Sequence, residues 1–162
     1  MSSSYDDLLA EHGINDLPEY AIKNGDLALL QWVLTYPIMF EEYEICNLAA
    51  INGQLNILQW ARQNNYNWNS CTSYHATYHQ HYHIFHWIHE NGGPNDDFYG
   101  YFITESMARN NRFEELKWAI ANGFPVNFSR VSSSAARNNN VEMLEWAFAQ
   151  PGGFHMDEDT CC

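Results

Sequence analysis

Basic residues are scarce in this chain. Its 162 residues include only 7 Lys and Arg against 20 Asp and Glu, and the formal net charge at pH 7 is −13. Binding to nucleic acid through the phosphates requires clustered Lys and Arg, so the composition predicts no nucleic-acid partner. The acidic balance favours solubility and, among protein partners, a basic one.

Long apolar runs are also absent. The longest are a few residues, far short of the about 20 that span a bilayer, and the first residues, MSSSYDD, are acidic with no apolar signal segment. We therefore expect no membrane association and an intracellular, cytoplasmic location. Without an oxidising compartment or a C-x-x-C motif, all four cysteines are expected to be free thiols. They are Cys46, Cys71, Cys161 and Cys162.

The Cys161-Cys162 pair resembles the double-cysteine end that receives prenyl groups in small GTPases of membrane traffic. Prenylated tails usually carry basic residues before the modified cysteine. Here the preceding residues are the acidic MDEDT, which argues against prenylation. A mass measurement of the protein from eukaryotic cells answers this question.

Motifs of catalysis and nucleotide binding are missing. The sequence contains no G-x-S-x-G, no H-E-x-x-H and no Walker loop. The serine run Ser132-Ser133-Ser134 precedes two alanines at a predicted helix start, where capping explains it better than nucleophilic chemistry. We therefore expect a protein without catalytic residues and without a cofactor.

Tryptophan, by contrast, is abundant and evenly spaced. Five of the six tryptophans form a ladder with steps of 28, 27, 31 and 28 residues. They are Trp32, Trp60, Trp87, Trp118 and Trp146. A recurring spacing of 20–50 residues indicates a repeat architecture.

Similar residues recur at fixed offsets from each ladder tryptophan. Eleven residues before it stand Ala21, Ala49, Ala76, Met107 and Ala135. Eight before it stand Asn24, Asn52, His79, Asn110 and Asn138. Five before it stand Leu27, Leu55, Tyr82, Phe113 and Val141. Two before it stand Leu30, Leu58, Phe85, Leu116 and Leu144, and one after it stand Val33, Ala61, Ile88, Ala119 and Ala147. The chain therefore contains five copies of one unit.

Each copy is predicted to form two helices. The apolar residues five and two before the tryptophan, the tryptophan and the residue after it have helical spacing, and Gly or Asn ends this second helix. The Ala-rich stretch before it forms a shorter first helix. A turn of Asn-Gly or Asn-Asn joins the two, because both residue types tolerate left-handed backbone; His79-Gln80 replaces it in the third copy. Ser73, Thr104 and Ser132, each fourteen before its tryptophan, are predicted N-caps.

The predicted fold is an all-α solenoid in a single domain over residues 1–162. Residues 4–13 form an N-terminal capping helix, the repeats occupy 14–40, 41–69, 70–98, 99–128 and 129–155, and 156–162 form an acidic tail. The longer step of 31 residues predicts one longer loop over Pro94–Tyr99. The ladder tryptophans are expected to be buried core residues, and Trp68 is expected to plug the base of its own repeat.

Two stretches of the sequence resemble a known family. INGQLNILQWARQNNYNWN (51–69) and NNRFEELKWAIANGFPVNF (110–128) resemble ankyrin-repeat units of the form NGHLEVLKWARENGCPWN. This short-period, tryptophan-bearing variant is typical of ankyrin-like families encoded by giant DNA viruses of protists, and the resemblance covers roughly residues 14–155. The T-P-L-H opening of standard ankyrin repeats is absent, which predicts tight loops and a flatter binding face.

The resemblance implies a non-enzymatic protein-interaction module, which in a virus would act on host proteins in the host cytoplasm. Its binding face would include the position nine before each ladder tryptophan, at the end of the first helix. These residues, which we call the −9 column, are Lys23, Ile51, Tyr78, Arg109 and Arg137. Tyr and Arg are favoured at interface hot spots. Arg112, one of four arginines clustered over 109–137, completes the predicted partner-binding set.

The third copy is rich in histidine. Six of the eight histidines lie over residues 75–89, and His75, His79, His83 and His86 have spacings of three or four that suit a Zn²⁺ or Ni²⁺ site. The same positions are polar or variable in the other copies, so they are also explained as solvent-facing residues. One alternative function is therefore a metal- or pH-responsive surface. Another is a structural protein that associates weakly with itself rather than remaining a monomer.

Overall fold

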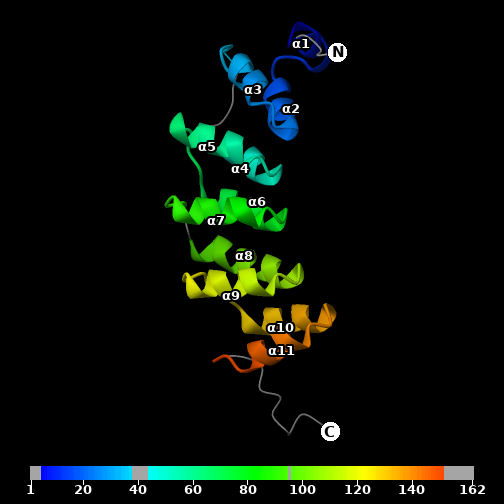
Figure 1. Cartoon of the computed structure of the whole chain (residues 1–162), viewed down its shortest axis with the longest axis vertical. Coiled ribbons are helices and arrows are strands. Elements are labelled where there is room, and N and C mark those ends of the chain that lie inside the picture. Colours follow the sequence, from blue (N-terminus) through cyan, green and yellow to red (C-terminus); the bar gives the residue numbers. More distant parts are fainter. Residues whose placement is uncertain (1–4, 38–43, 95, 152–162) are drawn as a thin grey trace. The chain divides into compact units, whose positions relative to one another are not determined.

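The computed structural model describes residues 5–37, 44–94 and 96–151, and all regular secondary structure in these ranges is helical (Figure 1). The prediction of an all-α protein is confirmed for them. Eleven helices are described: α1 (Tyr5–His12), α2 (Leu17–Asn24), α3 (Leu27–Val33), α4 (Glu44–Ile51), α5 (Leu55–Gln63), α6 (Ser70–Tyr78), α7 (Tyr82–Glu90), α8 (Asp97–Arg109), α9 (Phe113–Ala121), α10 (Phe128–Arg137) and α11 (Val141–Phe148). Within these ranges, no helix combines the length and apolar character that crossing a bilayer requires. The predicted acidic tail and Cys161-Cys162 lie outside the described residues.

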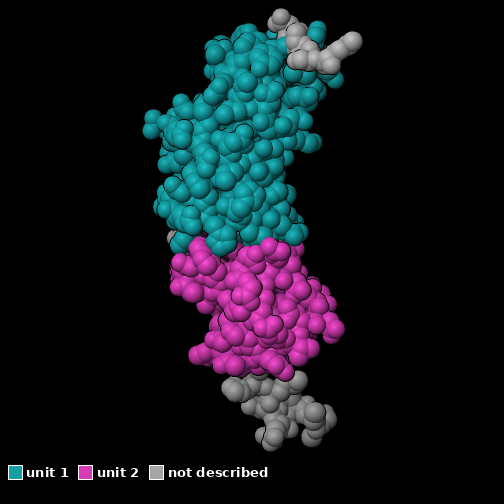
Figure 2. Space-filling model, in the orientation of Figure 1, with its two compact units in different colours: residues 1–94 teal, residues 95–162 magenta. Residues whose placement is uncertain are grey.

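The chain forms two compact units (Figure 2). Unit 1, residues 1–94, contains α1 to α7, and unit 2, residues 95–162, contains α8 to α11. In unit 1 the pairs are α2/α3, α4/α5 and α6/α7, and the first helices of successive pairs pack together. In unit 2 the pairs are α8/α9 and α10/α11, and α8 packs on α10. The predicted helix pairs are thus present in both units, and α1 coincides with the predicted capping helix.

The turn inside each pair has one backbone geometry. Its second residue has a positive φ between 54° and 74°, and these residues are Gly25, Gly53, Gln80, Asn111 and Asn139. The N–H of the residue that follows donates to the carbonyl five positions earlier, for example His81 to Ala76 at 2.7 Å and Asn140 to Ala135 at 2.9 Å. This is the bond of a Schellman motif, which ends a helix and reverses the chain. The predicted turn is confirmed, including in the third pair.

In the three pairs of unit 1 the second helix contributes three buried positions to the core. These lie three and two residues before the ladder tryptophan and one after it, as in Ile57, Leu58 and Ala61, which are fully buried. In unit 2 each second helix contributes two of the three, because Glu115 and Leu144 are half-buried. The residue eleven before the tryptophan is also fully buried in all five pairs. Since an α-helix turns about 100° per residue, these positions point in one general direction and the tryptophan lies at its edge.

The ladder tryptophans are accordingly half-buried, and the expectation that they form the core is wrong. Four of the five indoles instead pack against neighbouring aromatic rings. Trp32 lies 5.1 Å from Tyr5 between ring centroids, and Trp146 lies 5.7 Å from Phe128. Trp68, in the loop after α5, meets Trp87 edge to face at 5.7 Å, so it contacts the following pair as well as its own.

The predicted N-caps are wrong. Ser73, Thr104 and Ser132 are buried inside α6, α8 and α10. The hydroxyls of Thr104 and Ser132 bond to the backbone there: Ser132 donates to the Phe128 carbonyl at 2.9 Å, as such residues do when they lie within a helix. The serine run 132–134 is therefore part of α10 and caps nothing. The N-caps of the three helices are Asn69, Asp96 and Asn127.

The longer loop predicted at Pro94–Tyr99 is also wrong in its second half, because α8 begins at Asp97 and runs for 13 residues. The side chain of Asp96 accepts a hydrogen bond from the Tyr99 N–H at 2.8 Å and so starts the helix early. Gly100 then packs against the loop before α10. A Cβ at Gly100 would lie 2.5 Å from Cδ of Pro125. The additional residues of the 31-residue step thus lengthen α8. Asn95 lies outside the described residues.

Candidate functional site

The −9 column lies where the sequence predicted, in the last turn of each first helix. Lys23, Tyr78, Arg109 and Arg137 are exposed, and Ile51 is half-buried. In unit 2 two members are neighbours: the amide of Asn138, which follows Arg137, donates to the carbonyls of Ala108 and Arg109 at 3.0 and 3.1 Å. The ends of α8 and α10 are therefore pinned together with both arginines at the surface.

Charged contacts tie Arg109 to a second element. Glu105 is largely buried, and its two carboxylate oxygens accept hydrogen bonds from Arg109 at 3.0 Å and from Arg130 at 2.7 Å. Arg112 is placed differently, since it precedes α9 and pairs with Glu115 at 2.8 Å. Arg109 and Arg130 thus form one cationic site across α8 and α10, and Arg112 is not part of it.

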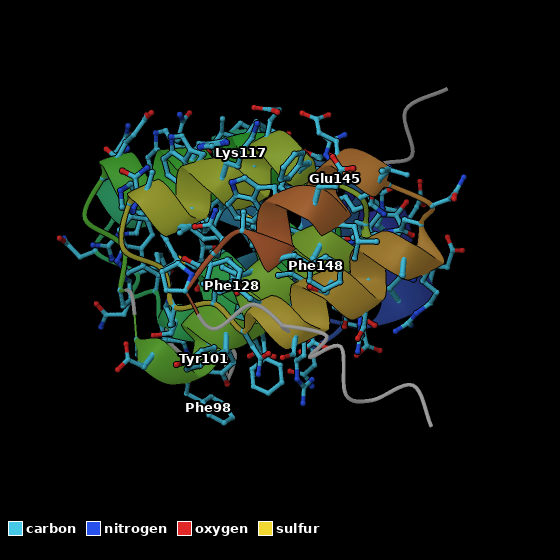
Figure 3. The ribbon with its side chains drawn as sticks, turned by 90° about the horizontal axis from the view of Figure 1, so that it is seen from below. Phe98, Tyr101, Lys117, Phe128, Glu145 and Phe148 are labelled. Atoms are coloured by element: carbon cyan, nitrogen blue, oxygen red, sulfur yellow. The ribbon has the colours of Figure 1, made fainter. Side chains whose placement is uncertain are left out.

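An aromatic pocket adjoins this cationic site in unit 2, and sequence reasoning missed it. A cavity of about 340 Å³ lies between α8 and the start of α10. Its lining residues are Phe98, Tyr101, Phe102, Thr104, Glu105, Asn127 and Arg130. Figure 3 shows Phe98 pointing away from the ribbon, with Tyr101 beside it. The spacing of residues 98, 101, 102 and 105 marks one face of a helix, a signal that could have revealed the pocket.

The four histidines predicted as metal ligands are not brought together. His75 lies on α6 and His79 caps its end, with ring centroids 6.5 Å apart, while His83 and His86 lie on α7 beyond the left-handed turn at Gln80. Among the residues that the structure describes, no group of three or more His, Cys, Asp or Glu is placed to hold a metal ion. The pKa of His75 is lowered by burial and, to a smaller degree, by the neighbouring His79.

His81 contacts the preceding helix pair, which its sequence context did not indicate. It precedes α7, and its Nε2 lies 3.1 Å from the carbonyl oxygen of Ile51 at the end of α4. Burial lowers its pKa, the hydrogen bond to Ile51 raises it, and His83 and His79 lower it further. Because Ile51 belongs to the −9 column, His81 helps to fix the backbone that presents it.

Two of the predicted thiols, Cys46 and Cys71, are described, and neither forms a disulfide. Cys46 is fully buried in α4. Burial raises its pKa to about 11, against a smaller lowering by Arg62. A thiol that stays protonated is a poor nucleophile, so Cys46 belongs to the core.

Fold and site together define a helical protein built from stacked helix pairs, with polar and aromatic side chains displayed at the ends of the first helices. No family model matches the chain, and no curated protein matches its sequence.

Proposed function

We propose that this chain is a non-enzymatic protein-interaction module, an ankyrin-like α-solenoid that binds a protein partner through its −9 column. The resemblance to the tryptophan-bearing ankyrin-like repeats of giant DNA viruses extends the proposal. In that setting the partner is a host protein and the chain acts in the host cytoplasm.

One contrast within each helix pair carries the proposal. Two residues before the −9 position, an Ala or Met is fully buried, and two residues after it the backbone is left-handed. These neighbours are fixed by packing and by the Schellman turn. The −9 side chain between them is exposed in four pairs and half-buried at Ile51, and its chemistry ranges from Lys and Arg to Ile and Tyr. A constant frame that displays variable Lys, Ile, Tyr and Arg side chains has the composition of an interaction surface, where Tyr and Arg contribute most.

The experiment compares two fourfold alanine variants by affinity capture from the relevant cell and quantitative mass spectrometry. The first replaces Ile51, Tyr78, Arg109 and Arg137. The matched control replaces Gln31, Asn56, Glu114 and Glu142, which are exposed residues of second helices. We expect the first variant to recover about tenfold less of its partners, or less still, than the wild type. The control should recover them as the wild type does. Equal recovery by a folded first variant would reject this face.

A second candidate is a pH-responsive surface on the third helix pair. The observation that favours it is the lowered pKa of both His75, in the last turn of α6, and His81, at the end of the segment joining α6 to α7. Protonation of these rings in mild acid would place charge on partly buried side chains beside the −9 column and so disfavour the packing around it, although the hydrogen bond of His81 to the Ile51 carbonyl favours the charged ring. Partner capture at pH 7.5 and pH 5.5 separates the two candidates. Only the second predicts that the amount of captured partner changes between these pH values and that a His75→Gln, His81→Gln variant abolishes this change.

A further inference from the structure

Three aromatic side chains are exposed side by side on the first two turns of α8. Phe98, Tyr101 and Phe102 are 66%, 49% and 42% exposed. The rings of Phe98 and Phe102 meet edge to face at 5.1 Å, so the patch holds its shape before any ligand arrives. Clustered exposed apolar side chains on a protein surface mark sites of interaction.

The patch is one wall of the pocket of about 340 Å³ between α8 and α10. The opposite wall carries Asn127 and Arg130, from the start of α10. Thr104 contributes little polarity to the interior, since its hydroxyl is committed to backbone oxygens, including that of Pro125 at 2.8 Å. The volume is at the small end of the range of ligand sites, about 300–1,000 Å³, and suits a single large side chain.

The charge at the pocket is positive although the chain is strongly acidic. Glu105 is shared by Arg109 and Arg130, which leaves the group of three with a net positive charge. Each guanidinium has five N–H donors, and each of these arginines gives one nitrogen to Glu105. Both are more than half exposed at the side chain. They can therefore accept a second carboxylate from solution.

The openness of the site favours a peptide over a small molecule. Small-molecule pockets bury about 70–90% of the ligand surface, whereas the aromatic wall here remains largely in water. A second copy of this chain is disfavoured by its net charge of −13, which makes copies repel. A flexible peptide can place one apolar side chain against Phe98, Tyr101 and Phe102 and a neighbouring carboxylate on the arginines.

We infer that the pocket between α8 and α10 binds a partner peptide in which a large apolar side chain is followed by Asp or Glu. This inference rests on the proposed interaction function and names the chemistry of the partner. The apolar side chain enters between α8 and α10, and the carboxylate pairs with Arg130 and Arg109 in the charge-assisted geometry that guanidinium groups favour.

The test is a titration of the isotopically labelled full chain with the peptide Gly-Gly-Phe-Asp-Glu-Gly-Gly, followed by amide NMR signals. Two control peptides replace Phe by Ser, or Asp-Glu by Asn-Gln. We expect saturable shifts of α8 and α10 signals below about 2 mM peptide, a range that detects weak sites. Each control peptide, and the variants Phe98→Ser and Arg130→Gln, should bind about tenfold more weakly or worse.

Matched variants outside the pocket separate local from general effects. Val141→Ser removes a similarly exposed apolar side chain in unit 2, since Val141 is 59% exposed, and Lys117→Gln removes a cation from α9. Both should bind the peptide as the wild type does. Absent shifts, or shifts that survive both pocket substitutions, would overturn the inference.

A different occupant would also overturn it. If a second copy fills the pocket, light scattering shows a dimer that Phe98→Ser dissociates. The fourfold −9 variant keeps failure of this inference distinct from failure of the proposed function. If that variant loses its captured partners while the wild type does not bind the peptide, the proposed function stands and only the peptide pocket is rejected.

Discussion

The ring of His81 lies directly over Gly53, so closely that a Cβ at Gly53 would be 2.8 Å from the ring carbon Cε1. The same relationship recurs one pair earlier, where a Cβ at Gly25 would lie 2.7 Å from the side-chain oxygen of Gln54. In both cases the residue that precedes a second helix covers the left-handed turn of the preceding pair. In unit 2 the equivalent contact is a hydrogen bond of 2.7 Å from Asn140 to Asn111. These contacts join one pair to the next through the turns.

Gly53→Ala is predicted to destabilise unit 1 by about 2–4 kcal/mol, combining left-handed strain with the clash against His81. Gly92→Ala is the matched control: its φ is 73° against 74° for Gly53, but a Cβ there meets nothing within 4 Å. It should lose only the strain, about 1–2 kcal/mol. Urea denaturation of both variants measures the difference. Equal losses would show that the His81 contact does not restrict Gly53.

Gln80→Gly is predicted to stabilise the protein. Gln80 has φ 64°, a conformation that costs a residue with a Cβ about 1–2 kcal/mol. Part of that gain is offset because glycine has greater freedom in the unfolded chain. We expect a net increase of about 0.5–1 kcal/mol in the free energy of unfolding. Asn139→Gly should gain less, since Asn tolerates this region. A lower midpoint in urea for the Gln80 variant would contradict the strain argument.

Gly100→Ala is predicted to lower stability although the residue lies within α8. Replacing a helical glycine by alanine usually gains about 1 kcal/mol. Here the new methyl group would lie 2.5 Å from Cδ and 2.7 Å from Cγ of Pro125. We expect this overpacking to prevail, with a net loss of about 1–2 kcal/mol. The exposed Ser133→Ala in α10 serves as the control and should change stability little. Thermal unfolding of the two variants tests the sign.

Stability is predicted to fall in mild acid through His75 and His81. The folded protein lowers the pKa of both below 6.5, mainly by burial, so the unfolded chain binds protons more readily. Their contribution is complete above pH 6.5 and is lost as the pH drops through the folded-state pKa values. Melting temperatures at pH 7.5 and pH 5.0 measure the loss.

The matched variant for the pH experiment is His75→Gln, His81→Gln, in which position 81 acquires the residue that Gln54 provides one pair earlier. Its melting temperature should change less between the two pH values than that of the wild type. Neutralisation of carboxylates acts on both proteins alike, so the difference between them reports the histidines. An unchanged pH dependence would assign it to other groups.

Much of the fold could be predicted because the repeat fixes local geometry. The residues eleven before each tryptophan, four alanines and a methionine, located the first helices, and the Asn or Gly residues after them marked the end of the first helix in four of the five pairs. The role of a single repeated position was harder to predict from its residue type. Ser73, Thr104 and Ser132 looked like N-caps because capping and backbone hydrogen bonding within a helix use the same residue types.

The site could be predicted only where it follows the repeat. The −9 column is repeated, so its position at the helix ends was accessible from the sequence. The aromatic pocket is not repeated. It depends on Asp96 starting α8 early and on Arg130 reaching Glu105 from α10, 25 residues further along the chain. A contact of that kind depends on how the two helices pack, which periodicity does not specify.

The Schellman turn has a consequence for how such a chain can change. Because the buried residue and the left-handed residue on either side of the −9 position carry the folding information, the residue between them is under little constraint from stability. If the −9 column is the proposed recognition surface, mutation can therefore change one contact after another in it without unfolding the protein. Such a chain could follow a changing partner quickly, since different residues of the same short segment determine specificity and folding.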